Sequence, residues 1–173
     1  MKVNVNWGSK NENAKFRVQG ADLESAGKFL QARGEWGSFS GHFPYKWKAT
    51  AQGQVSSVVI SPTYTIQMPT WAAYRKQSES CKNEWDEMWR ALRKHEAGHR
   101  DIFLRGISKL VGDLEAIEST TGPEIDDLME RAGAAVQKEH DDYDSRTDHG
   151  KSRGVELSIS EECRTQPKGS RSK

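Results

Sequence analysis

The stretch NEWDEMWRALRKHEAGHRDIFLRGISKLVGDLEAI, residues 83–117, decides how this chain is organised. Its apolar residues recur at intervals of three and four, as they do on one face of a helix. They are Trp85, Met88, Trp89, Leu92, Ile102, Phe103, Ile107, Leu110, Leu114 and Ile117. His95, Glu96 and His99 fall on or beside the same stripe, where a helix that faces a core would ordinarily carry apolar side chains. The pattern therefore predicts a long amphipathic helix with polar chemistry on its inward face.

The segment HEAGH, residues 95–99, is an H-E-x-x-H motif. Residues four apart on a helix project from one face, so the Nε2 atoms of His95 and His99 can converge on a single metal ion. Zinc bound in this way lowers the pKa of a bound water to about 7, and the glutamate beside the first histidine can accept its proton. We therefore expect Zn²⁺ at His95 and His99, with Glu96 as the general base in peptide-bond hydrolysis. The mid-helix Gly98 indicates either close helix packing or the approach of another backbone or a ligand.

A hydrolytic zinc site needs a third protein ligand. A second helix is predicted from Glu124 to about Asp148, and it ends in KEHDDYDSRTDHG, residues 138–150. Antiparallel pairing would bring this end back towards the middle or start of the first helix. The possible ligands there are Glu139, His140, His149 and several aspartates. The same run is also typical of a solvated helix end, so the residues themselves leave the third ligand open.

The first 70 residues mostly predict strands. Alternating apolar and polar residues mark strands at 3–7, 43–51 and 58–68, and the glycine of the segment 52–54 suits a hairpin turn. Prolines in and after the third strand place it at or near a sheet edge. We expect these strands to form one antiparallel sheet.

A short helix is predicted between the early strands. Asp22 is its expected N-cap, Leu23, Ala26 and Leu30 form its apolar stripe, and Gly34 ends it. The glycine- and serine-rich segment 34–42 is predicted to be a loop.

Length and charge limit the remaining possibilities. The 173 residues favour one domain, residues 1–163, followed by a disordered basic tail at 164–173. With 26 basic and 25 acidic residues, the net charge of +1 gives no overall attraction to nucleic acid or membrane. Cys81 and Cys163 could form a disulfide or remain free thiols. No apolar run is long enough to span a membrane, and the first ten residues, MKVNVNWGSK, lack the apolar region of a signal peptide. The chain as written is therefore expected to be cytoplasmic.

Four segments together resemble a known family. These are FRVQG (16–20), TYTIQMPTW (63–71), LRKHEAGHRDIF (92–103) and YDSRTDHG (143–150). In this order they resemble the bacterial predicted secreted zinc-dependent proteases, a family still filed as a domain of unknown function. The resemblance runs from about Phe16 to Gly154. It implies a zincin-like metallopeptidase, a hydrolase whose members usually carry an export signal and act in a secreted or periplasmic location.

The resemblance also implies particular roles. His149 would be the third zinc ligand, with Glu139 as its rival; Tyr143 would stabilise the oxyanion, and Asp144 would orient a ligand imidazole from behind. The strand Tyr64–Met68 would be the sheet edge that pairs with an extended peptide or protein substrate.

We therefore expect an α+β fold in which an antiparallel sheet and a short helix precede two long helices that carry the zinc site. The leading hypothesis is a zinc metalloprotease. The alternative is a non-catalytic binding module that keeps the metal as a staple for a small core. A third hypothesis is hydrolysis of an amide other than a protein backbone. Substrate preference and oligomeric state are not defined by the sequence.

Overall fold

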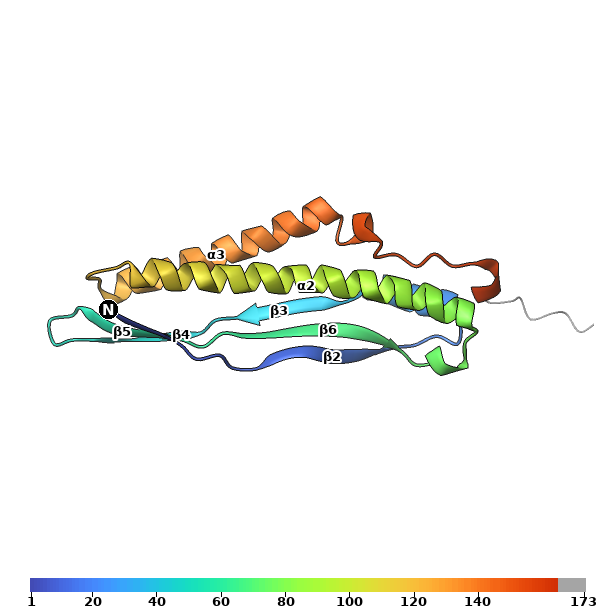
Figure 1. The fold of residues 1–173 in the computed structure, drawn as a ribbon, viewed down its shortest axis with the longest axis horizontal. Helices are drawn as coiled ribbons and strands as arrows, with labels where there is room; N and C mark the ends of the chain where they lie inside the picture. Colours follow the sequence, from blue (N-terminus) through green and yellow to red (C-terminus); the bar gives the residue numbers. More distant parts are fainter. Residues whose placement is uncertain (165–173) are drawn as a thin grey trace, which may run out of the picture.

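The structure, a computed structural model, describes residues 1–164. Within them the chain is α+β, with three α-helices and two small mixed sheets. Helix α2, Glu79–Glu115, runs along the length of the molecule, and the two sheets lie end to end on one side of it (Figure 1). Helix α3, Gly122–Thr147, starts near the far end of α2 and returns alongside it. The predicted pair of long helices is thus present in the fold.

Each sheet has three strands. The first has the order β1 (Lys2–Val5), β5 (Val55–Ile60), β4 (Tyr45–Ala49); the second has the order β2 (Lys10–Val18), β6 (Thr63–Trp71), β3 (Ser38–His42). In both, the first-named pair is parallel and the second-named pair is antiparallel. The prediction of one antiparallel sheet was therefore wrong. Alternation along a strand reports burial of one face, which does not depend on the direction of the neighbouring strand.

Two prolines mark the division between the sheets. Pro44 separates β3 from β4, and Pro62 separates β5 from β6. Proline has no N–H to donate to a sheet, so the ladder is interrupted at both positions. The carbonyl oxygens still pair: Ser61 N donates to Pro44 O at 2.8 Å, and Gly8 N donates to Pro62 O at 2.9 Å. The single strand predicted at 58–68 is consequently two strands.

The edge of the second sheet differs from the prediction. Tyr64–Met68 lies in β6, which is hydrogen-bonded to β2 on one side and β3 on the other, so its prediction as a substrate-pairing edge was wrong. The edge strands are β2 and β3. Strand β3 lies inside the segment 34–42 that was predicted to be a loop.

Helix α1, Leu23–Arg33, confirms the predicted short helix. The Asp22 carboxylate accepts a hydrogen bond from Ser25 N at 2.8 Å, and Gly34 ends the helix with φ of 83°. This capping satisfies backbone groups that would otherwise have no partner. Leu23 and Leu30 are fully buried in a cluster with the first half of α2 and with β6.

Two glycines let α3 approach α2 closely. A Cβ atom at Gly98 would lie only 2.5 Å from Cζ of Tyr143, and one at Gly106 would clash with Cγ2 of Val136. Both glycines lie on α2 and both partners lie on α3, so the helices run antiparallel with their backbones in close contact. The approach brings the last turns of α3 over the middle of α2, where the HEAGH segment lies.

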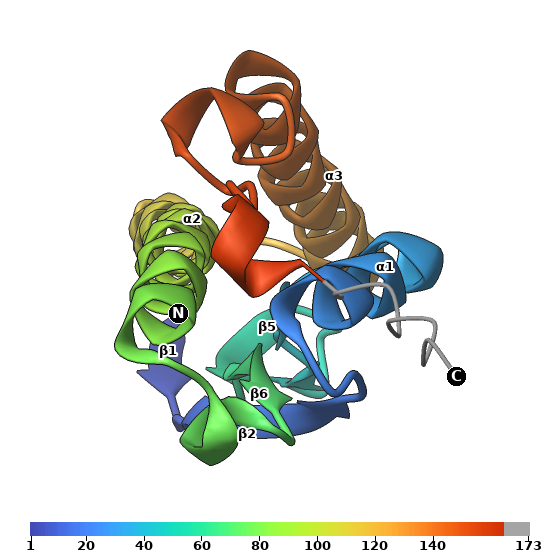
Figure 2. The same ribbon diagram turned by 90° about the vertical axis from the view of Figure 1, so that its right-hand side faces the viewer.

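The chain after α3 returns to the start of α2. Residues 154–164 pass between α2 and α1 in Figure 2. Near the end of this segment, Cys163 forms a disulfide with Cys81. Val155 and Cys163 are buried in the same cluster as α1. The disulfide decides a pairing that the sequence left open. The tail predicted at 164–173 lies, from residue 165 onwards, outside the described residues. No described helix is both long and apolar enough to cross a bilayer.

Candidate metal centre

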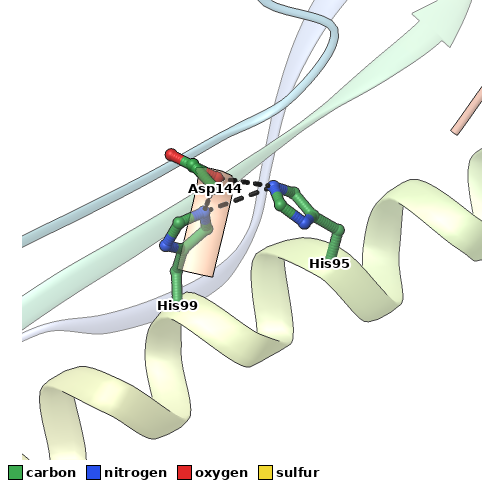
Figure 3. Close-up of side chains that lie close together, drawn as sticks. All are labelled: His95, His99 and Asp144. Carbon is green, nitrogen blue, oxygen red and sulfur yellow. Dashed lines mark hydrogen bonds and ion pairs between the residues drawn. The ribbon is translucent and has the colours of Figure 1, made fainter. Parts of the chain in front are cut away.

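Two histidines of α2 and one aspartate of α3 converge on a common point (Figure 3). Oδ1 of Asp144 lies 3.0 Å from Nε2 of His99 and 3.2 Å from Nε2 of His95. The two Nε2 atoms are 3.3 Å apart. The spacing of four residues in HEAGH gives the two imidazoles a shared face, and the close packing of α3 supplies the carboxylate.

Burial keeps both imidazoles in the form that a metal requires. His95 and His99 are 5% and 7% exposed. Removal from water lowers the pKa of His95 below its usual 6.5 and lowers that of His99 to about 4, although the Asp144 carboxylate opposes both changes. Both rings are therefore neutral at pH 7, with an unprotonated nitrogen available as a ligand.

The cluster fits a divalent metal ion. Its three ligand atoms lie within 4.8 Å of one another, and neutral imidazoles with one carboxylate are a donor set that zinc accepts. Nδ1 of His95 is also buried with no hydrogen-bond partner among the described residues. An unsatisfied buried nitrogen is costly, and such exceptions concentrate at functional sites. These residues therefore form a possible metal-binding cluster.

Glu96 lies beside the cluster in an apolar setting. It is 4% exposed, and no hydrogen bond from residues 1–164 reaches its carboxylate. Burial, with smaller contributions from the charges of Asp144 and Glu35, raises its pKa to about 8. A nearby divalent cation acts in the opposite sense and favours the carboxylate. The protonation state of Glu96 therefore depends on whether a cation is bound nearby.

A large cavity opens over these residues. Its volume is about 2290 Å³, and its wall includes His95, Glu96, His99 and Asp144. Strand β3 and the segment before it form another part of the wall. Gly37 lies so near the centre that a Cβ atom there would be 3.0 Å from Oε1 of Glu96. The edge strand and the carboxylate therefore face the same space.

Tyr143 lies outside this cavity. Its hydroxyl donates to the backbone O of His95 at 3.3 Å, and its ring stacks on the His95 ring with centroids 5.1 Å apart. It is buried against Gly98, between the two helices. The predicted oxyanion partner is thus placed as a support for His95 and for α2.

The predicted third ligand also lies away from the cluster. His149 has a side chain that is 77% exposed, and its Nδ1 is 3.9 Å from Oδ2 of Asp144. Its rival Glu139 is exposed and lies 3.6 Å from Arg105 in an ion pair. Asp144 was predicted to hydrogen-bond a ligand imidazole on the side away from the metal. Its Oδ1 instead lies close to the Nε2 atoms of both His95 and His99. The structure thus brings together His95, Glu96, His99 and Asp144.

His140 is the member of the site that sequence reasoning left least defined. Its Nδ1 lies 2.9 Å from Nδ1 of His99, and it lines the cavity. His140 and Asp144 are four residues apart on α3, as His95 and His99 are on α2. Matching spacings on two antiparallel helices were the available signal for this pairing.

An α+β fold with a cluster of two buried histidines and one half-buried aspartate defines this chain as a protein with a candidate metal centre. Residues 14–150 match the model of a family described as "Bacterial protein of unknown function (DUF922)", and the chain belongs to this family. The match confirms the predicted membership of this family, whose description assigns no function. No curated protein and no solved structure matches the chain.

Proposed function

We propose that this protein is a zinc-dependent peptidase. His95, His99 and Asp144 would hold the ion, and Glu96 would be the general base. The proposal depends on one observation above all: three ligand atoms within 4.8 Å of one another lie in a cavity wall beside a buried glutamate. Asp144 takes the place that the resemblance assigned to His149, because the His149 side chain is largely exposed.

Each residue has a defined task in this proposal. A bound Zn²⁺ would supply Lewis-acid activation of water and of the substrate carbonyl. His95 and His99 would contribute neutral nitrogens, and Asp144 would contribute the one negative charge. Glu96 would accept a proton at its carboxylate and return it to the leaving amine. Its buried position, without a competing hydrogen bond, suits a group that must take up and release a proton.

The cavity favours an extended substrate. Its volume of about 2290 Å³ exceeds the roughly 300–1,000 Å³ of typical small-ligand pockets. Strand β3 pairs with β6 on one side only, so its other side can pair with a peptide backbone. We therefore assign substrate pairing to Ser38–His42 in place of Tyr64–Met68.

Metal analysis of purified variants tests the ligand set. We expect about one zinc per chain in the wild type, loss of zinc in Asp144→Asn, and retention of zinc in His149→Ala. The matched pair separates the two candidate third ligands. Loss of zinc in His149→Ala with retention in Asp144→Asn would refute our assignment.

Cleavage of an unfolded protein or a peptide library tests the chemistry. Glu96→Gln should keep its zinc and lose hydrolysis by roughly 10²- to 10⁴-fold, the usual contribution of a positioned general base. Cell-wall fragments serve as a parallel substrate, because preferential hydrolysis of these would indicate an amide other than the protein backbone. Equal hydrolysis by wild type and Glu96→Gln would rule out the proposed base.

A metal-stapled binding module is the second candidate. One observation favours it: the cluster joins α2 to α3, so an ion there would fasten the two helices together. In this case zinc removal would lower the melting temperature strongly, and no substrate would be cleaved by the wild type.

The disulfide supports a location outside the cytoplasm. Cys81 and Cys163 are bonded, and disulfides persist mainly in oxidising compartments. We infer that the protein acts in a secreted or periplasmic setting, as the resemblance implies. Thiol labelling of protein taken directly from its native cells would find both cysteines blocked if this inference is right, and both labelled if it is wrong.

A further inference from the structure

His140 makes a contact with the candidate metal centre that the proposed chemistry does not use. Its Nδ1 lies 2.9 Å from Nδ1 of His99, while Nε2 of His99 faces Asp144. A neutral imidazole carries one proton, so in a hydrogen bond between two such nitrogens one ring donates and the other accepts. Which ring donates depends on whether Nε2, the other nitrogen of His99, carries the proton of that ring.

Metal binding would fix the direction of this hydrogen bond. A metal held in the cluster would take the lone pair of His99 Nε2, which leaves the proton of that ring on Nδ1. His99 Nδ1 then donates, and His140 Nδ1 accepts. We propose that His140 is a positioning residue that holds His99 in its metal-binding tautomer and ring orientation. This inference rests on the metal site proposed above.

The surroundings of His140 suit this role. Its ring packs beside Phe39 of β3, with centroids 5.5 Å apart, so the acceptor is held from the sheet side as well as by α3. Ligand histidines usually donate to a carboxylate or a carbonyl oxygen, and such partners typically contribute 10- to 100-fold in metal affinity. Here an imidazole occupies the acceptor position.

The two ligand histidines are supported in different ways. Nδ1 of His95 has no hydrogen-bond partner in the described chain, and the His95 ring is instead held by stacking on Tyr143. His99 meets Tyr143 only edge-on, with an interplanar angle of 84°. The hydrogen bond that His99 donates to His140 is therefore the main polar restraint on His99 away from the cluster itself.

Two substitutions separate a positioning role from packing. In His140→Asn, Oδ1 is three bonds from Cα, as Nδ1 is in histidine, and it can accept the same hydrogen bond. In His140→Leu, the side chain has a similar reach but is apolar and offers no acceptor. His42→Leu, on the exposed end of β3, is the matched control. For each we would measure Zn²⁺ affinity by chelator competition, the visible absorption of the Co²⁺-substituted protein, and urea unfolding of the metal-free protein.

We expect His140→Leu to bind Zn²⁺ about 10- to 100-fold more weakly and to change the Co²⁺ spectrum, since one ligand is no longer held in place. His140→Asn should stay within about threefold of the wild type, and His42→Leu should not differ from it. Metal-free stability should change little in any of them. Unchanged affinity in His140→Leu, or equal losses in the Leu and Asn variants, would overturn the role of His140 while leaving the metal site intact. A wild-type protein that takes up no metal would overturn both.

Discussion

Replacing Gly98 by alanine tests the helix contact that delivers Asp144 to the cluster. In an open position on a helix, a change from glycine to alanine stabilises by about 1 kcal/mol. Gly98 is not open: an added Cβ atom would lie 2.5 Å from Cζ of Tyr143, whereas carbon atoms in contact are normally about 3.5 to 4.0 Å apart. The tyrosine would have to move by roughly 1 Å, with the α3 turn that carries it.

The size of the effect follows from two opposing contributions. Overpacking of a buried contact costs about 1 to 3 kcal/mol, and the clash with Tyr143 belongs at the upper end of that range because neither helix backbone can yield easily. After the gain in helix propensity, we expect Gly98→Ala to lower the free energy of unfolding by about 1 to 2 kcal/mol. Because Asp144 follows Tyr143 directly, zinc affinity should fall as well.

Gly112 provides the matched control on the same helix. Nothing lies within 4 Å of a Cβ atom added there, so Gly112→Ala should stabilise by about 0.5 to 1 kcal/mol. Urea denaturation of the metal-free proteins measures both changes. Introducing Gly98→Ala into a Tyr143→Ala background removes the clash and should turn its effect from destabilising to stabilising. If Gly98→Ala and Gly112→Ala stabilise the wild type equally, Tyr143 is not seated against α2 as described.

Three further predictions concern the disulfide and two glutamates. Mutating Cys81 and Cys163 to serine should lower the unfolding free energy by about 4.5 kcal/mol, the loop-entropy value for a sequence separation of 82, and a change below about 1 kcal/mol in urea denaturation would argue against the bond. In metal-free protein, burial raises the pKa of Glu96 to about 8, so its ionisation disfavours the folded state increasingly as pH rises from 4.5 to 8. Glu96→Gln should therefore gain about 3 kcal/mol over the wild type between pH 5 and pH 8, and parallel pH profiles would contradict this. Glu12 has a lowered pKa, chiefly because Tyr64 donates to its carboxylate at 2.8 Å, so its contribution is present above about pH 4.5 and is lost as pH falls. Glu12→Gln should cost about 1 kcal/mol at pH 7 and less at pH 3, and a constant difference across that range would exclude the assignment.

The helices were predictable from the sequence because their signals are local. Asp22 and Gly34 bound α1 as expected, and the apolar stripe in residues 83–117 marks most of α2. His95 and His99 share a face because they are four residues apart on that helix. Propensity, capping and periodicity act within a few turns, so the chain itself contains the information.

Strand β3 was not predicted because its glycines are explained by a contact with α2, which is distant in sequence. The segment 34–42 is rich in glycine and serine, which ordinarily indicates a loop. Gly37 and Gly41 are needed because α2 approaches so closely: Cβ atoms there would lie 3.0 Å from Oε1 of Glu96 and 2.7 Å from Cδ2 of Phe103. Small residues that allow close packing cannot be told from small residues that allow flexibility until the partner is known.

The position of His149 away from the cluster was not predictable for a related reason. Which side chain enters the cluster depends on how α3 is rotated about its axis, which the contact between Gly98 and Tyr143 sets. Helix α3 ends at Thr147, and the next two residues have φ of 46° and 51°, in the left-handed region. Because the backbone reverses there, the His149 side chain points outwards, whereas Asp144, still within the helix, lies in the cluster. A motif matched by letters alone does not record this change of direction.

The disulfide also gives the site a particular topology. The covalent link between Cys81 and Cys163 closes the intervening chain into a ring, and His95, Glu96, His99 and Asp144 all lie within it. A single cut in any surface loop of that ring opens it without releasing a fragment, because the polypeptide stays connected through the sulfur atoms. A protein that works among proteases, or that nicks its own copies, would in this way keep all four site residues on one molecule until a reductant reaches the bond.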